Sequence, residues 1–265
     1  MKKSQSIIKT NKISKTASDV IAPIAAIAVI FGIWFFLSGT DVMPSYMMPS
    51  PLDVIKAFAA DHKVLWEHGL TTLGEAMMGL GIGIAFSFLT AMLMDACKPV
   101  YSALYPLIIV TQTIPSIAIA PLLMLWMGYG ILPKIVLVAI TTFFPVCVSL
   151  LEGFKAADED TLNLLRIMGA GKTKRFWYVK FPYSLGYFFS GLKISVTYAV
   201  VGAVISEWMG GQSGLGVYMT RVRKSFAYDK MFAIIIYIAV ISLLLILITN
   251  IIKWLAMPWE RKNIK

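Results

Sequence analysis

Long apolar stretches separated by short polar segments are the main pattern along this chain. Apolar residues predominate over residues 20–38, 69–94, 100–127, 131–151, 184–206 and 231–255. A helix needs about 20 predominantly apolar residues to cross a bilayer, and each stretch comes close to that length or exceeds it. The pattern therefore predicts an all-α integral membrane protein with six transmembrane helices.

The third stretch is longer than one straight crossing requires, and it contains three prolines. Pro106, Pro115 and Pro121 each lack a backbone donor, so we expect this helix to bend. Gln112 and Thr113 lie beside the middle proline. Their side chains either bond the carbonyls that the bend frees or line a path through the membrane.

Composition and charge support the membrane interpretation. The chain is 58% hydrophobic and 14% charged, with a net charge of +10, whereas soluble domains are about 45–50% apolar and about 25% charged. With the N-terminus inside, 16 of the 24 Lys and Arg residues fall inside, seven fall outside, and Lys193 lies within the fifth crossing. This bias predicts two cytoplasmic termini. Because the basic residues are spread over loop ends, a nucleic-acid surface is excluded.

Few ionisable residues lie within the apolar stretches, and each is a candidate for function because a charge is costly in a membrane. Lys193 either faces a hydrated cavity or extends toward the cytoplasmic interface. Glu207, at the outer end of the fifth crossing, either gates a path, pairs with Arg221 or Arg223, or is an interfacial charge at a helix end. Glu75 is expected to interact with the helix dipole at the start of the second crossing.

Other residues in or near the crossings are expected to have structural roles. Gly79 and Gly83 are spaced four apart, which predicts close contact with a neighbouring helix. Cys97 and Cys147 lie in or beside apolar runs and outside any metal-binding pattern, which predicts small buried side chains. The glycine-rich segment 210–216 predicts a turn or re-entrant loop on the outer side, or a contact with an external partner.

Two polar segments are predicted to form short amphipathic helices. In 47–58, Ser50 can cap the helix and Pro51 suits its first position, and an apolar face predicts that the helix lies on the outer membrane surface. In 158–169, acidic residues stand at the helix start and Gly169 can take the left-handed conformation that ends it. This second helix lies in the largest cytoplasmic loop.

The sequence MGAGKTKR, residues 168–175, resembles the end of a nucleotide-binding phosphate loop. The full pattern needs a glycine at the position that Arg166 occupies. A phosphate loop also follows a β-strand, whereas residues 168–175 follow a predicted helix. The alternative is a basic turn after the helix. Lys172, Lys174 and Arg175 would then face anionic lipid headgroups, with the following aromatic residues at the membrane interface.

A helix isolated in a long cytoplasmic loop between the fourth and fifth crossings resembles the arrangement in permease subunits of ABC importers. That family's signature is Glu-Ala-Ala, three residues, Gly, nine residues, Ile, one residue and Leu-Pro. Aligning its glycine with Gly169 places Val179, Phe181 and Pro182 at the Ile, Leu and Pro positions without gaps. The Glu-Ala-Ala positions fall on Asn-Leu-Leu at 163–165, a departure that removes the family's glutamate.

Longer segments extend the resemblance over nearly the whole chain. They are PSPLDV, TQTIPSIAIAPLLMLWMGYG, FFPVCVSLLEGFKAAD, SGLKISVTYAVVGAVISEW and GLGVYM. These segments look like the branch that imports nitrate, sulfonates, taurine and thiamine-precursor pyrimidines. The fourth looks most like permeases for thiamine-precursor pyrimidines or riboflavin.

The resemblance implies six transmembrane helices of the type I ABC importer permease. Residues 1–18 would be a cytoplasmic tail and 19–265 the transmembrane permease domain, with the coupling-helix loop at about 152–183. Ile167 would add to the apolar surface of the coupling helix. The residues expected to couple this helix to an ATPase are Leu162, Asn163, Leu164, Leu165, Arg166, Met168, Gly169, Ala170 and Pro182. The candidates for the translocation path are Gln112, Thr113, Lys193 and Glu207.

The resemblance also implies a division of labour in a bacterial inner membrane. Two separate ATPase subunits would bind ATP, while this chain would bind no cofactor or metal and catalyse no reaction. A second permease copy, an extracytoplasmic solute-binding protein and membrane lipid are the other expected partners, and nucleic acid is not. The alternative is a secondary transporter or channel without an ATPase. Such proteins usually show inverted repeats or several buried ionisable groups.

Overall fold

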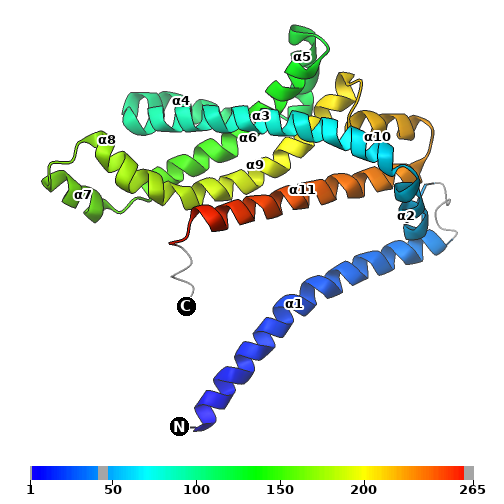
Figure 1. Ribbon diagram of the computed structural model, residues 1–265, viewed down its shortest axis with the longest axis horizontal. Coiled ribbons are helices and arrows are strands. Elements are labelled where there is room, and N and C mark those ends of the chain that lie inside the picture. The colour runs from blue at the N-terminus through cyan, green and yellow to red at the C-terminus, as the bar shows by residue number, and fades with distance from the viewer. Residues whose placement is uncertain (1, 41–46, 260–265) are drawn as a thin grey trace. The chain divides into compact units, whose positions relative to one another are not determined.

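The computed structural model describes residues 2–40 and 47–259, which fold into helices joined by short loops (Figure 1). In chain order the elements are α1 (Lys2–Gly39), α2 (Pro51–Ala60), α3 (His62–Ala96), α4 (Lys98–Thr111), α5 (Ser116–Met127), α6 (Ile131–Lys155), α7 (Glu159–Ile167), α8 (Lys172–Arg175), the π-helix η1 (Phe176–Lys180), α9 (Phe181–Gly210), α10 (Leu215–Lys224) and α11 (Tyr228–Ala256). The described part of the chain holds no strand, which confirms the all-α prediction.

Each of the six predicted crossings corresponds to a helical segment. By length and composition, five segments of the described chain are long and apolar enough to span a membrane, and the bent pair α4–α5 makes a sixth. The five include α3, with 35 residues, and the continuous segment Lys172–Gly210, with 39 residues. Both are longer than the apolar stretches that predicted them, because polar turns at their ends continue the helix.

The third crossing is divided into two helices that meet at an angle of 100°. Pro115 immediately precedes α5 and has extended backbone, with φ −60° and ψ 130°. A proline has no N–H to donate and disfavours a helical conformation in the residue before it. The predicted bend is therefore confirmed at the middle proline, while Pro106 and Pro121 lie inside the two helices.

The chain forms two compact units, Met1–Asp61 with Val222–Ala233, and His62–Arg221 with Ile234–Lys265. The first unit contains α2. The hydroxyl oxygen of Ser50 accepts a hydrogen bond from the Asp53 N–H, and Pro51 opens the helix, so the predicted cap is confirmed.

One face of α2 is packed within the first unit. Val54 and Ala57 are buried against Ala233 and the side chain of Trp34. The indole Nε1 of Trp34 donates a hydrogen bond of 3.1 Å to the Pro49 carbonyl. This polar contact and the apolar packing together fix the start of α2.

The second unit is built around α6, which packs along both α3 and α9. Two serine hydroxyls connect these helices. Ser87 of α3 donates to the Phe143 carbonyl at 2.8 Å, and Ser195 of α9 donates to the Thr142 carbonyl at 2.9 Å. Small polar residues of this kind allow close approach of membrane helices and satisfy their backbones where no water is available.

Small residues also set the distance between α3 and α6. A Cβ atom on Gly79 would overlap the Val138 side chain, and one on Gly83 would overlap the Thr142 hydroxyl. The close helix contact predicted from the spacing of these two glycines is therefore confirmed.

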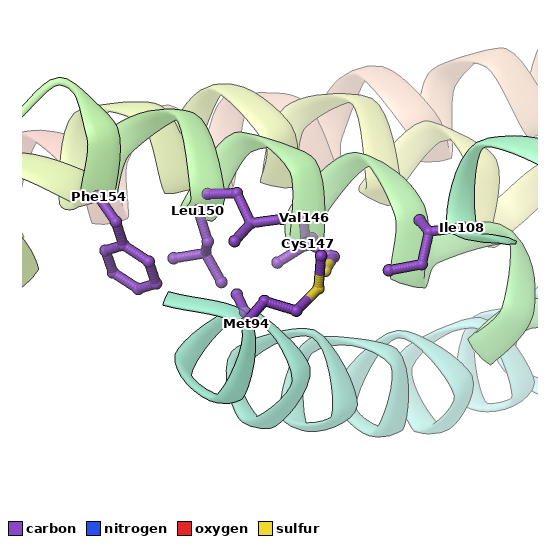
Figure 2. Packing of buried hydrophobic residues seen from close by; sticks show 8 residues of the cluster. Met94, Ile108, Val146, Cys147, Leu150 and Phe154 are labelled. Atoms are coloured by element: carbon purple, nitrogen blue, oxygen red, sulfur yellow. The ribbon is translucent and has the colours of Figure 1, made fainter. Parts of the chain in front are cut away.

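A cluster of buried apolar side chains fills the space between α3, α4 and α6 (Figure 2). Its labelled members are Met94 of α3, Ile108 of α4, and Val146, Cys147, Leu150 and Phe154 of α6. Cys147 is fully buried, as predicted, but Cys97 is exposed. The prediction for Cys97 was wrong because this residue lies in the short break between α3 and α4, outside the packed helices.

Candidate functional site

The helix α7 occupies the loop between α6 and α8, and both of its ends are fixed by local bonding. The Asp158 carboxylate accepts hydrogen bonds from the Thr161 hydroxyl and from the Thr161 N–H, and these bonds hold the pKa of Asp158 below its ordinary value. After the helix, Gly169 has φ 82°, a left-handed conformation that favours glycine. Both predicted ends of this helix are confirmed.

The residues of the chain that the structure describes leave an apolar face of α7 uncovered. Ile167, Met168 and Leu164 are 84%, 73% and 58% exposed. Leu162 and Leu165 are half-buried, so the five apolar residues predicted to form one surface are divided between an outward and an inward side. Of the other predicted coupling residues, Asn163, Arg166 and Gly169 are exposed and Ala170 is half-buried.

A continuous helical segment, Lys172–Gly210, leads from the α7 loop into α9 within the second unit. Within η1, the Phe181 N–H donates to the Phe176 carbonyl five residues earlier. Pro182 follows in the first turn of α9. A proline removes one α-helical hydrogen bond and crowds the carbonyl four residues earlier, which explains a wider turn at this place. Val179, three residues before Pro182, is buried.

A cavity of about 220 Å³ lies where α4 and α5 meet, against α6 and α9. Its lining combines hydroxyl, amide and apolar groups from all four helices and contains no charged residue. The lining residues are Thr111, Gln112, Ile114, Pro115, Ser116, Ile119, Ile140, Thr141, Tyr198, Val201 and Gly202. A broken membrane helix beside a cavity is a common way to build a solute site, because the interrupted backbone offers free polar groups.

The candidates for the translocation path are not brought together. Gln112 lines the cavity at the bend, whereas the Thr113 hydroxyl and N–H both donate to the Val110 carbonyl, at 2.8 Å and 3.0 Å. Lys193 is half-buried elsewhere on α9. Glu207 belongs to a separate buried cluster near the end of the same helix. Gln112 is therefore the member of this pair that stays a candidate for the path.

The Glu207 carboxylate anchors the start of the helix that follows the glycine-rich segment. It is 1% exposed and accepts hydrogen bonds from the Thr72 hydroxyl at 2.7 Å and from the Gly216 N–H at 2.6 Å. Both oxygens of the carboxylate thus have partners within the second unit. The prediction of an interfacial charge was therefore wrong, because the chain after α9 folds back over the carboxylate.

Further bonds from the same loop explain why its path requires glycine. The Gly214 N–H donates to His68 Nδ1 at 2.9 Å, and the Leu215 N–H donates to the Thr72 hydroxyl oxygen at 2.8 Å. Gly214 has φ 120°, and a Cβ atom there would overlap the Glu207 carboxylate. The predicted turn is confirmed as a loop bound to α3.

Close to this cluster, Lys134 of α6 and Glu75 of α3 form a buried ion pair. Lys134 Nζ lies 2.6 Å from Glu75 Oε1, and the two side chains are 6% and 4% exposed. Glu75 was expected at a helix start, and this expectation was wrong, because α3 begins 13 residues before Glu75 and the first turn of α6 packs against it. Opposite charges within two apolar stretches were the signal available in the sequence.

Comparison with known proteins agrees with this architecture. Residues 79–256 match the family described as binding-protein-dependent transport system inner membrane component. A probable ABC transporter permease protein of Haemophilus influenzae is 33% identical over 226 residues, covering 85% of this chain and 92% of that protein. A formylaminopyrimidine transport permease protein of Halalkalibacterium halodurans is 30% identical over 250 residues, covering 94% of this chain and all of the relative.

Two solved structures share the fold. An amino acid ABC transporter has a TM-score of 0.60 with 18% identity over 75% of this chain and 95% of that chain. The MetNI methionine ABC transporter has a TM-score of 0.58 with 16% identity over 72% of this chain and 93% of that chain. Because the family match covers most of the chain and the relatives align over nearly their full length, this protein belongs to the inner-membrane permeases of binding-protein-dependent ABC importers and spans the bacterial cell membrane several times.

Proposed function

We propose that α7 is the helix through which a separate ATPase subunit drives this permease. The observation that carries the proposal is the outward apolar face of Leu164, Ile167 and Met168 on a helix whose two ends are fixed. A short amphipathic helix of this kind suits a groove on a partner. Burying each of these side chains would contribute about 1.5–3 kcal/mol to docking.

The path from α7 to the cavity runs through one helical segment. Gly169 and Ala170 end α7, and Lys172–Gly210 continues without a break to α9, which carries Tyr198 in the cavity wall. A displacement of α7 by the ATPase would therefore move α9 against α6. Pro182 and the π-turn before it are the place where this segment can bend.

Two ATPase subunits, a second permease copy and an extracytoplasmic binding protein complete the proposed assembly. The excess of Lys and Arg on the α7 side of the membrane supports cytoplasmic termini. A second permease copy could pack against a row of exposed side chains on α9. Ile194, Tyr198 and Val201 are 50%, 47% and 44% exposed, and the last two also line the cavity. ATP would be bound by the ATPase, and this chain would need no cofactor of its own.

The chemistry of the cavity supports a small neutral solute. Its polar lining comes from hydroxyl groups, the Gln112 amide and the Tyr198 ring, and it has no cation to hold a sulfonate or nitrate anion. At about 220 Å³ it is smaller than the ~300–1,000 Å³ typical of drug-sized ligands. We infer that the substrate is a single-ring heteroaromatic compound such as a pyrimidine, the class named for the Halalkalibacterium relative.

The coupling proposal is tested by reconstituting the permease with its ATPase and a binding protein. Ile167→Asp places a charge in the docking face, and Gly169→Val forces a branched side chain into a left-handed position. Both variants should insert normally but lose most ATP-driven uptake of a radiolabelled pyrimidine. Tyr129→Asp is the matched control, because Tyr129 is 81% exposed in the loop between α5 and α6, at the opposite end of α6 from α7.

The result that contradicts the proposal is unchanged uptake in both α7 variants. Labelled taurine tests the inference about substrate in the same vesicles. Uptake of taurine and not of the pyrimidine would overturn the neutral-solute inference while leaving the coupling proposal intact.

A further inference from the structure

A second cavity, of about 430 Å³, lies where α7, α8 and η1 meet the end of α3. Three basic side chains and two aromatic rings contribute to its wall. The lining residues are Met92, Asp95, Ala96, Leu162, Lys172, Thr173, Arg175, Phe176, Trp177 and Lys180. It is separate from the cavity at the α4–α5 bend, with which it shares no lining residue.

The charges of this cavity are unbalanced. Lys180 Nζ lies 2.6 Å from Asp95 Oδ1, so the acidic group in the wall is already paired. In the part of the chain that the structure describes, neither Lys172 nor Arg175 forms an ion pair, and the Nε of Arg175 is buried without a hydrogen-bond partner. Lys172 and Arg175 therefore leave the cavity wall with positive charge that no described acidic group balances, which favours an external anion.

The geometry of the donors favours a phosphate group. A guanidinium presents planar donors suited to phosphate oxygens, and a nearby ammonium adds a point charge. The Thr173 hydroxyl supplies a further donor in the wall. An isolated carboxylate would satisfy fewer of these donors.

The position of the cavity favours a phosphate that belongs to a lipid. It lies at the end of the membrane-spanning α3 and at the start of the segment that leads into α9. Trp177 and Tyr178 are 51% and 75% exposed there, and aromatic side chains of this kind gather at the level of lipid headgroups. The apolar walls from Met92 and Phe176 can take the first part of an acyl chain.

We propose that this cavity binds the phosphate headgroup of an anionic membrane lipid through Lys172 and Arg175. Leu162 of α7 is part of the same wall, so a bound headgroup connects the coupling helix to the end of α3. The segment Gly171-Lys172-Thr173 resembles a phosphate loop, and this proposal gives its basic residue a role that needs no nucleotide. Lys172 would bind the phosphate of a lipid headgroup. The inference concerns binding alone and does not depend on the identity of the transported solute.

The test uses the full-length chain in detergent and native mass spectrometry, with phosphatidylglycerol as the probe. Lys172→Ala and Arg175→Gln should each weaken retention of the lipid roughly fivefold, as expected for loss of one basic contact with an anionic headgroup. Lys174→Ala is the matched control, because Lys174 carries the same charge two residues away, is exposed, and does not line the cavity. Arg175→Lys keeps the charge and removes the buried Nε donor, so it provides a second test if Arg175→Gln folds poorly.

Two further arms distinguish the sources of the phosphate. If inorganic phosphate binds with the same dependence on Lys172 and Arg175 while phosphatidylglycerol does not bind, the lipid assignment is overturned. Zwitterionic phosphatidylcholine should be retained more weakly than phosphatidylglycerol.

Equal lipid retention by the wild-type chain and both substituted chains would also overturn the proposal. So would variants that keep the lipid but lose co-isolation with the ATPase, because the basic residues would then belong to the protein interface.

Discussion

Breaking the buried pair between Lys134 and Glu75 should destabilise the helix bundle severely. In Lys134→Met the Glu75 carboxylate stays in the α3–α6 interface after its counter-charge has gone. The pair is 2.6 Å apart, and its side chains are only 6% and 4% exposed. Removing one partner of such a buried pair costs about 3–5 kcal/mol. For a protein of this size that corresponds to a fall in melting temperature of roughly 6–20 °C.

The assay is thermal unfolding of the purified chain in detergent, followed by circular dichroism. A double variant, Glu75→Gln with Lys134→Met, removes both charges and should recover most of the lost stability, because well-packed neutral groups can replace a buried pair. Lys56→Met is the control, since Lys56 and Asp53 are 3.8 Å apart with side chains 79% and 54% exposed. Exposed pairs of this kind contribute about 0–1 kcal/mol.

A double variant as unstable as Lys134→Met would refute the reasoning, because the loss would then come from packing and not from an unpaired charge. A melting temperature unchanged in Lys134→Met would show that the pair is not desolvated.

Three further predictions concern packing, the glycine loop and the cavity at the bend. Gly79→Ala should lower the free energy of unfolding by about 1–3 kcal/mol, since the added Cβ would overlap α6. Gly81→Ala is the control, because a Cβ there would meet open space and should leave the free energy of unfolding unchanged. Thermal unfolding of the two variants compares them. Gly214→Ala should displace the loop from Glu207 because of its φ of 120° and the overlap with the carboxylate, and faster amide hydrogen exchange over 211–216 would show this. Gln112→Leu should weaken pyrimidine uptake roughly 3- to 10-fold, the value of one hydrogen bond, with ATPase binding unaffected; unchanged uptake would remove Gln112 from the path.

The number and place of the membrane helices could be predicted from the sequence because a bilayer imposes a simple length rule on apolar segments. The bend at Pro115 and the two ends of α7 were also predictable, since proline, Asp158 and Gly169 act through local backbone geometry. The sequence did not predict that Leu162 and Leu165 of α7 would be half-buried while Leu164 is exposed. Which side of a short helix faces its own chain depends on how α8 and η1 return to α3.

The buried charges were the main failure of prediction, and the reason is tertiary. Glu75, Lys134 and Glu207 come from three different helices, and their pairing is set by the register of α3, α6 and α9. Each residue alone looks like a helix-end charge. Only the folded bundle shows that Glu207 accepts from Thr72 and from a backbone N–H nine residues farther along the chain.

The central claim, that α7 receives a separate ATPase, is tested most directly by cross-linking in intact membranes. Ile167→Cys would be made in a Cys97→Ser background, because Cys97 is exposed and would otherwise react. A bifunctional maleimide should join residue 167 to the ATPase, and Tyr129→Cys, at a comparably exposed site in the loop before α6, should give no such product. A product from position 129 and none from position 167 would contradict the account.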